Sequence, residues 1–114
     1  MKIEMTDKIA VVSGGATLIG RAVVQALVDA GAKVAILDID ANGQEIANSM
    51  HGQAVFIQTD ITSDTGLQRA LQQIHRQLGR VDFLVNLACT YLDDGFKSTR
   101  GDWLHALDIN LVSA

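Results

Sequence analysis

Four short aliphatic runs, each followed by a stretch with helical periodicity, constrain the fold of this chain most strongly. The runs are rich in β-branched residues and do not alternate polar with apolar positions, which is typical of parallel strands covered on both faces. Strand and helix therefore alternate along the whole chain, which predicts an α/β fold with a doubly wound parallel sheet of about four strands and helices on both faces. The runs are Ile9–Val12, Val34–Leu37, Val55–Ile57 and Val81–Val85.

The segments that follow these runs predict the helices. The third helix has the clearest apolar repeat, with Ser63 or Asp64 as its N-cap and Gly79 at its end. The fourth begins near residue 101 or 102 and carries Trp103 and Leu107, which we expect in the core. The expected helices cover residues 19–30, 41–50, 64–78 and 101 onward.

Composition narrows the class of protein. A chain of 114 residues with 48% hydrophobic residues forms one domain, residues 1–114, with a real core. The formal net charge is −4 and the nine basic residues are scattered, so no nucleic-acid partner is expected. No apolar run approaches the ~20 residues that span a bilayer, and no signal peptide is visible. These features predict a cytoplasmic protein with no membrane partner.

Metal binding is not predicted from the ligand residues. The single cysteine, Cys89, excludes an internal disulfide and gives no metal-site spacing. Asp93 and Asp94 are adjacent acids in a polar stretch, for which hydrated side chains are the simpler interpretation. The three histidines have no partner ligands nearby in sequence, so we expect no metal site.

The sequence SGGATLIG, residues 13–20, joins the first expected strand to the first helix. Gly14 suits a tight turn, and Gly20 allows close packing of helix on strand. The helix N-terminus offers free N–H groups to an anion, and the Ser13 and Thr17 hydroxyls add donors. The spacing differs from G-x-G-x-x-G, so a nucleotide phosphate loop and a plain strand-to-helix turn both remain open.

Asp38 ends the second aliphatic run, 18 positions after Gly20. An acid at about this separation accepts the hydroxyls of an adenosine ribose and repels a 2′-phosphate. At ~4 Å that repulsion is about 1 kcal/mol in water and about 4 kcal/mol at an intermediate dielectric. The pattern predicts NAD as cofactor, with NADP less favoured; the alternative is a hydrated aspartate at a strand end.

Together with Asp38, the glycine segment resembles the short-chain dehydrogenase/reductase family, whose loop reads T-G-x-x-x-G-x-G. Ser13 stands for the threonine, Gly14 and Gly20 match, and Leu18 replaces the middle glycine. The resemblance extends through three later segments, TDIT, NLAC and DWLHALDINL. It implies a Rossmann-type fold in which the cofactor contacts Ser13, Gly14, Thr17, Leu18, Ile19, Gly20, Asp38, Asp60, Ile61, Asn86 and Ala88.

The later segments carry their own implied roles. Asp60 of TDIT would contact the adenine ring, with Ile61 packed beside it. In NLAC, which stands where the family has N-N-A-G, Asn86 and Ala88 match whereas Leu87 and Cys89 do not. In DWLHALDINL, Asn110 falls on the asparagine of the family's catalytic tetrad.

Two departures from the family pattern bear on the site. Leu18 disfavours a left-handed backbone by about 1–2 kcal/mol, so the loop either has ordinary negative φ there or is reshaped. Its side chain would also crowd a cofactor. For Cys89 we expect a small buried residue, because no basic neighbour in sequence depresses the pKa of its thiol.

The catalytic serine, tyrosine and lysine of the family are missing. Four residues after Tyr91, the sole tyrosine, stands Gly95, so no Y-x-x-x-K is present. We therefore expect the N-terminal, cofactor-binding half of a longer NAD(P)-dependent oxidoreductase acting on an alcohol or ketone, and a homo-oligomer when full length. Residues 91–100 would line its substrate entrance. The alternative is a non-catalytic nucleotide-binding or structural Rossmann fragment, and a downstream Y-x-x-x-K would separate the two.

Overall fold

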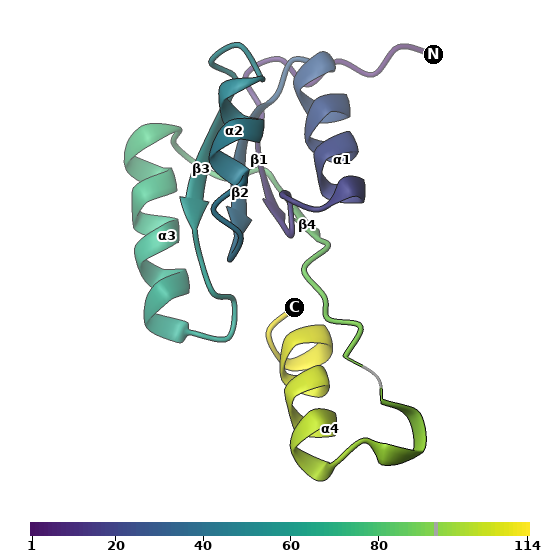
Figure 1. The fold of residues 1–114 in the computed structure, drawn as a ribbon. Helices are drawn as coiled ribbons and strands as arrows, with labels where there is room; N and C mark the ends of the chain where they lie inside the picture. The colour runs from purple at the N-terminus through teal and green to yellow at the C-terminus, as the bar shows by residue number, and fades with distance from the viewer. Residues whose placement is uncertain (93) are drawn as a thin grey trace.

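The computed structural model describes every residue of the chain except Asp93, so the prediction for that side chain lies outside the described residues. Parallel strands form one sheet in the order β3-β2-β1-β4, with β1 and β2 in its centre (Figure 1). The expected alternation of strand and helix is confirmed. The elements are β1 (Ile9–Ser13), α1 (Leu18–Asp29), β2 (Lys33–Asp38), α2 (Gly43–Asn48), β3 (Ala54–Gln58), α3 (Asp64–Gln77), β4 (Phe83–Asn86) and α4 (Arg100–Leu107).

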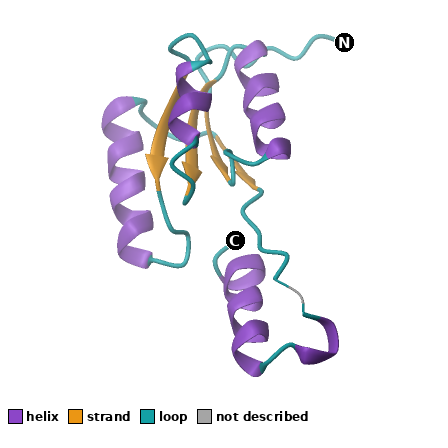
Figure 2. Ribbon diagram, in the orientation of Figure 1, coloured by secondary structure: helices purple, strands orange, loops and turns teal. Residues whose placement is uncertain are grey.

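Helices cover both faces of the sheet, as the aliphatic runs predict (Figure 2). On one face, Val12 and Ile36 of the sheet pack with Val24 of α1 and Ile46 of α2. On the other face, α3 contributes Ala70 and Ile74 to a separate cluster that includes Val11, Ala35, Leu37 and Ile57. Every residue of β1 is buried, because its neighbours in the sheet and both helical layers enclose it. The fold class is thus a Rossmann-type α/β sheet.

Strand β4 is shorter and more exposed than its sequence predicts. The expected run began at Val81, but the strand begins at Phe83. The cause is Asp82, whose carboxylate accepts the Ile9 N–H at 3.0 Å. This N–H is therefore not available for a backbone hydrogen bond that would extend β4 toward its N-terminus. As an edge strand, β4 leaves Leu84 61% exposed, and the sheet is open on this side.

The helix caps follow the sequence closely at α3. Ser63 accepts a hydrogen bond from the Gly66 amide, and Gly79 follows the helix with a φ of 108°. At α4, Thr99 and Asp102 form a reciprocal capping box. The helix then passes into one π-helical turn, Asp108–Val112.

The expected core positions on α4 are wrong. Trp103 is 64% exposed and Leu107 is 47% exposed. The physical reason is visible in Figure 1, where α4 lies beyond the C-terminal edge of the sheet and not against either face. Within the described residues, no helix is both long and apolar enough to cross a bilayer.

The β1–α1 turn brings backbone against backbone. Gly14 has a φ of 74°, and a Cβ on it would lie 2.6 Å from the Ala88 nitrogen. A Cβ on Gly20 would collide with the Gly14 oxygen. Neither neighbour is a flexible side-chain tip, so both positions require glycine and the close helix-on-strand packing predicted for Gly20 is confirmed.

Substituting Gly20 tests this packing. We expect Gly20→Ala to lower the free energy of unfolding by about 2–4 kcal/mol, because the added methyl group displaces main chain at the heart of the turn. Denaturant titration followed by circular dichroism measures the effect. Gly101→Ala is the matched control, since a Cβ there meets only Thr99 Oγ1 at 3.5 Å in an exposed helix, and it should be neutral or slightly stabilising. Equal effects of the two substitutions would contradict the packing account.

Candidate functional site

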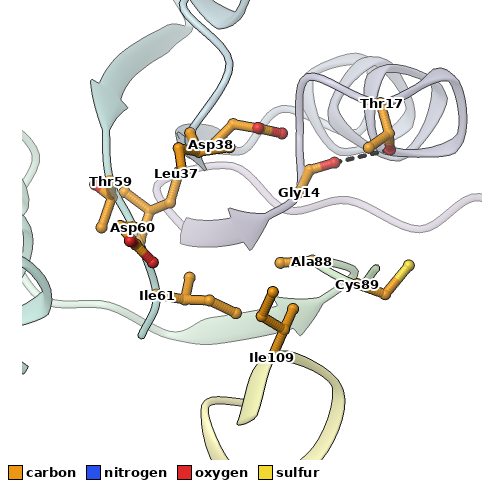
Figure 3. A pocket seen from close by; sticks show the side chains of 11 residues that line it. Gly14, Thr17, Leu37, Asp38, Thr59, Asp60, Ile61, Ala88, Cys89 and Ile109 are labelled. Carbon is orange, nitrogen blue, oxygen red and sulfur yellow. Dashed lines mark hydrogen bonds between the residues drawn. The ribbon is translucent and has the colours of Figure 1, made fainter. Parts of the chain in front are cut away.

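The C-terminal ends of the strands surround a cavity of about 130 Å³. Figure 3 shows Asp38 and Asp60 at the ends of neighbouring strands on one side and Gly14 and Thr17 on the other. Six residues predicted from the sequence meet here, although they lie as far as 74 positions apart. They are Gly14, Thr17, Asp38, Asp60, Ile61 and Ala88.

Asp38 occupies the tip of β2, half-buried, with both carboxylate oxygens hydrogen-bonded. Its Oδ2 accepts the Ala16 N–H at 2.9 Å, and its Oδ1 accepts the Asp40 N–H at 3.0 Å. The carboxylate therefore has a fixed orientation at the cavity wall. A carboxylate has about four acceptor positions, so acceptor capacity remains for a ligand hydroxyl.

Asp60 lies just after β3, where its carboxylate accepts hydrogen bonds from Thr62. The Thr62 hydroxyl donates to Oδ1 at 2.7 Å and the Thr62 amide donates at 2.9 Å. These bonds lower the pKa of Asp60 below its ordinary value, because they stabilise the charged form, and the bond from the hydroxyl has the larger effect. The cavity thus has a second carboxylate, which is ionised at neutral pH.

The glycine loop uses its hydroxyls internally. Thr17 Oγ1 donates to the Gly14 carbonyl at 2.8 Å and accepts the Gly20 N–H at 2.9 Å, so it caps α1. Ser13 is buried, and its hydroxyl lies 3.3 Å from the Leu87 nitrogen, to which it is an acceptor. Both hydroxyls, which sequence reasoning offered as phosphate donors, hold the protein backbone in this structure.

Leu18 adopts an ordinary negative φ, which resolves the two alternatives for this position. It is the first residue of α1, and its side chain is 90% exposed beside the helix N-terminus. The backbone is unstrained, and the apolar side chain belongs to the first turn of the helix, where the leading N–H groups have no intrahelical partner.

A second, larger cavity of about 670 Å³ adjoins the first and shares Thr17, Ala88 and Cys89 with it. Its lining includes four more residues predicted from the sequence, namely Leu18, Ile19, Asn86 and Asn110. Because they share these residues, the two cavities are adjacent, and we refer to them together as the elongated site. Of the eleven cofactor residues predicted, Ser13 and Gly20 lie beneath it as supports.

Asn110 lies in the π-helical turn and is bonded to the loop after β4. Its Oδ1 accepts the Thr90 N–H at 2.8 Å, and its Nδ2 donates to the Thr90 carbonyl at 3.0 Å. This pair of bonds fixes residue 90 to the end of α4. π-Helical turns inside α-helices occur frequently at functional sites.

Cys89 is exposed, so the expectation of a buried residue is wrong. The loop after β4 runs along the surface, which is why a small residue there is not enclosed. A hydrogen bond to the Cys89 thiol raises the pKa of the neighbouring Tyr91, which is itself exposed. The phenol therefore stays protonated at neutral pH, opposite to the lowered pKa that a catalytic tyrosine requires.

The arrangement fits a dinucleotide in shape and in donors. Bare backbone at Gly14 and Gly20 and a helix N-terminus suit a pyrophosphate, and Asp38 suits a ribose. Sequence reasoning missed several lining residues, although most of them stand beside predicted ones; Thr59, for example, precedes Asp60, and Ile109 precedes Asn110. The missed residues are Leu37, Ile39, Thr59 and Ile109 of the first cavity and Leu87 and Ala114 of the second. Over the part of the chain that the structure describes, no three His, Cys, Asp or Glu side chains gather as metal ligands.

The hydroxyl of Thr62 sets the acidity of Asp60. We expect Thr62→Val to raise the pKa of Asp60 toward its ordinary value, because the larger of the two stabilising bonds is lost. A carboxyl with a lowered folded-state pKa stabilises the fold above its unfolded pKa, and this stabilisation is lost as pH falls through the folded value. The variant should therefore lose part of its stability at neutral pH and show a weaker acid dependence.

Carboxyl-detected NMR titration measures this pKa directly. Thr65→Val is the control, because the Thr65 hydroxyl contacts Ser63 and not Asp60. An Asp60 pKa that is the same in both variants and in the wild type would contradict the assignment.

Comparison with known proteins gives consistent matches along the chain. The sequence profile of the family described as short chain dehydrogenase matches residues 8–114. The chain is 34% identical to the 3-beta-hydroxysteroid dehydrogenase of Comamonas testosteroni, over 99% of this chain and 45% of that protein. It is 37% identical to the human (Homo sapiens) 3-hydroxyacyl-CoA dehydrogenase type-2, over 91% of this chain and 43% of that protein.

The match extends to three dimensions. The crystal structure of gox2181 superposes with a TM-score of 0.90 at 36% identity, covering 98% of this chain and 46% of that one. The chain thus spans less than half the length of these relatives.

Proposed function

Because this chain belongs to the short-chain dehydrogenase family, with the fold of NAD(P)-dependent oxidoreductases, we propose that it supplies the cofactor-binding half of such an enzyme. Residues 1–114 form the nucleotide-binding domain, and the full protein transfers a hydride between a nicotinamide cofactor and an alcohol or carbonyl substrate. The observation that carries the proposal is the elongated double cavity around the glycine loop, where Asp38 lines one end and Asn110 the other.

The first cavity receives the adenosine of the cofactor. The Asp38 carboxylate accepts the ribose hydroxyls, and its charge disfavours a 2′-phosphate, so NAD is bound in preference to NADP. Ile61 provides an apolar surface for the adenine ring, and ionised Asp60 accepts from its amino group. This assignment uses the acceptor positions of Asp38 that its backbone bonds leave free.

The glycine loop receives the pyrophosphate. The N–H groups at the start of α1 point toward this position, and the positive end of the helix dipole attracts the negative charge. Gly14 gives the phosphate room to approach. We expect Leu18 to oppose this binding, because its apolar side chain belongs to the first turn of α1, beside the N–H groups that would receive the phosphate.

The second cavity receives the nicotinamide end, which supplies the hydride chemistry when bound. Asn86 and Ala88 border it, and Asn110 holds the Thr90 backbone at its rim. Asn110 is thus a positioning residue in this chain as well as the proposed tetrad member. The serine, tyrosine and lysine that the reaction requires belong to the remainder of the enzyme.

Exposed apolar residues on α4 and on the π-helical turn that follows it suit a subunit contact. Trp103, Leu104 and Leu111 are each at least 60% exposed, which is unusual for large apolar side chains. A homo-oligomer would cover them, and we place the assembled enzyme in the cytoplasm.

Cofactor preference tests the role of Asp38. In Asp38→Ser we expect the ratio of NAD to NADP affinity to fall by about fivefold or more, because the repulsion of the 2′-phosphate is removed. Titration calorimetry with each cofactor measures the ratio. Asp40→Ser removes the same charge two positions away and should leave the ratio nearly unchanged. A ratio that Asp38→Ser does not alter would exclude this residue as the ribose anchor.

Leu18 is expected to weaken cofactor binding. Leu18→Ala should tighten NAD binding by roughly tenfold, the value of one further hydrogen bond to a charged phosphate. Leu71→Ala on α3 is the matched control, because it truncates another exposed leucine away from the loop. Calorimetry distinguishes the two, and weaker NAD binding in Leu18→Ala would show that this side chain contributes favourable contact instead.

A further inference from the structure

Asp38 connects the glycine loop to β2 in addition to facing the cavity. Its Oδ2 accepts the Ala16 N–H at 2.9 Å, across 22 positions of sequence. This length is typical of a charge-assisted hydrogen bond, which is stronger than a neutral one. Its Oδ1 accepts the Asp40 N–H at 3.0 Å, so the carboxylate is held from its other side as well.

The middle of the loop depends on β2 for its position. The loop begins with the Gly14 amide bonded to the Leu37 carbonyl at 2.8 Å and ends at Thr17, which is bonded into α1. Between these points the Thr17 amide makes a longer bond, 3.3 Å, to the Gly14 carbonyl. The Ala16 amide reaches outward instead, to Asp38. The loop also lies directly on Ile36, since a Cβ on Gly15 would come within 2.7 Å of the Ile36 Cγ2 atom.

The charge of Asp38 and its hydrogen bond act on the pyrophosphate in opposite directions. A carboxylate beside the loop repels an anion, so its charge alone weakens phosphate binding. The bond to Ala16 holds the loop in the shape that presents the α1 amides, and this strengthens binding. Removing the side chain therefore strengthens pyrophosphate binding if the charge dominates, and weakens it if the positioning of the loop dominates.

We propose that Asp38 is a positioning residue for the pyrophosphate loop, through its bond to the Ala16 amide, as well as the anchor of the ribose. The inference rests on the proposed function, because it assigns a second task to a residue of the same site. It makes the adenosine and pyrophosphate sites one unit, in which a single carboxylate fixes the loop and carries the cofactor preference.

The test uses inorganic pyrophosphate, which lacks a ribose and so does not report the anchoring role. The ¹⁵N-labelled 114-residue chain is compared with Asp38→Ser and with Asp40→Ser, which removes an equal charge without touching the loop. Amide hydrogen exchange of Ala16 is measured without ligand, and pyrophosphate affinity is measured by NMR titration. Thermal unfolding of each variant verifies that it is folded.

We expect the Ala16 amide of Asp38→Ser to exchange roughly tenfold faster and pyrophosphate to bind roughly tenfold more weakly, whereas Asp40→Ser keeps the exchange rate and binds slightly more tightly. Unchanged Ala16 exchange, or tighter pyrophosphate binding in Asp38→Ser, would overturn the proposal. If Asp38→Ser does not fold, Asp38→Asn is used in its place. The proposal would then be overturned if the pyrophosphate affinity does not change in parallel with the exchange protection of the Ala16 amide.

The exchange measurement needs no ligand, so it separates the two ideas. A wild-type chain that binds no NAD but protects Ala16 through Asp38 would refute the proposed function alone. A chain that binds NAD with an unprotected Ala16 amide would refute the positioning role alone.

Discussion

The contact of main chain with main chain at the β1–α1 turn is the constraint on which the rest of the site depends. Gly20 lets the first turn of α1 rest on the end of β1, and Gly14 lets that end approach the backbone of Ala88 after β4. A side chain at Gly20 would push the first turn of α1 away from residues 14 and 15, and one at Gly14 would push the turn away from the backbone of Leu87 and Ala88. With these contacts made, the β1–α1 turn, the start of α1 and the segment after β4 meet at the C-terminal edge of the sheet. Both cavities lie around this meeting point.

The two ends of this elongated site differ in character. Both ends are lined largely by apolar surface, but the end at β2 and β3 also has carboxylates, at Asp38 and Asp60, that are oriented by backbone and hydroxyl donors. The end near α4 is mostly apolar, and Leu18 extends into it from the helix start. In the proposed complex, the end with the carboxylates receives the nucleoside, and Leu18 lies beside the phosphates. In this proposal, different residues determine the preference among cofactors and the affinity for them.

Local patterns in the sequence were sufficient for the parallel sheet and for the positions of Asp38 and Asp60, because strand ends of such a sheet share one edge. They narrowed the N-cap of α3 to Ser63 or Asp64, and the structure has Ser63. Long-range contacts could not be predicted from such local patterns. The exposure of Trp103 follows from where α4 lies, and the late start of β4 follows from the bond between Asp82 and Ile9. The link between Asn110 and Thr90 joins segments that no periodicity connects.

The direct test of the central claim is a titration of the ¹⁵N-labelled chain with NAD, followed by NMR. The account predicts saturable shifts in the amides of residues 14–20, together with those of Asp38, Asp60 and Ile61, while α3 stays unaffected. Such a map would place the cofactor in the elongated site. The absence of shifts at millimolar NAD, or shifts confined to other surfaces, would contradict the claim that this chain binds a nicotinamide cofactor.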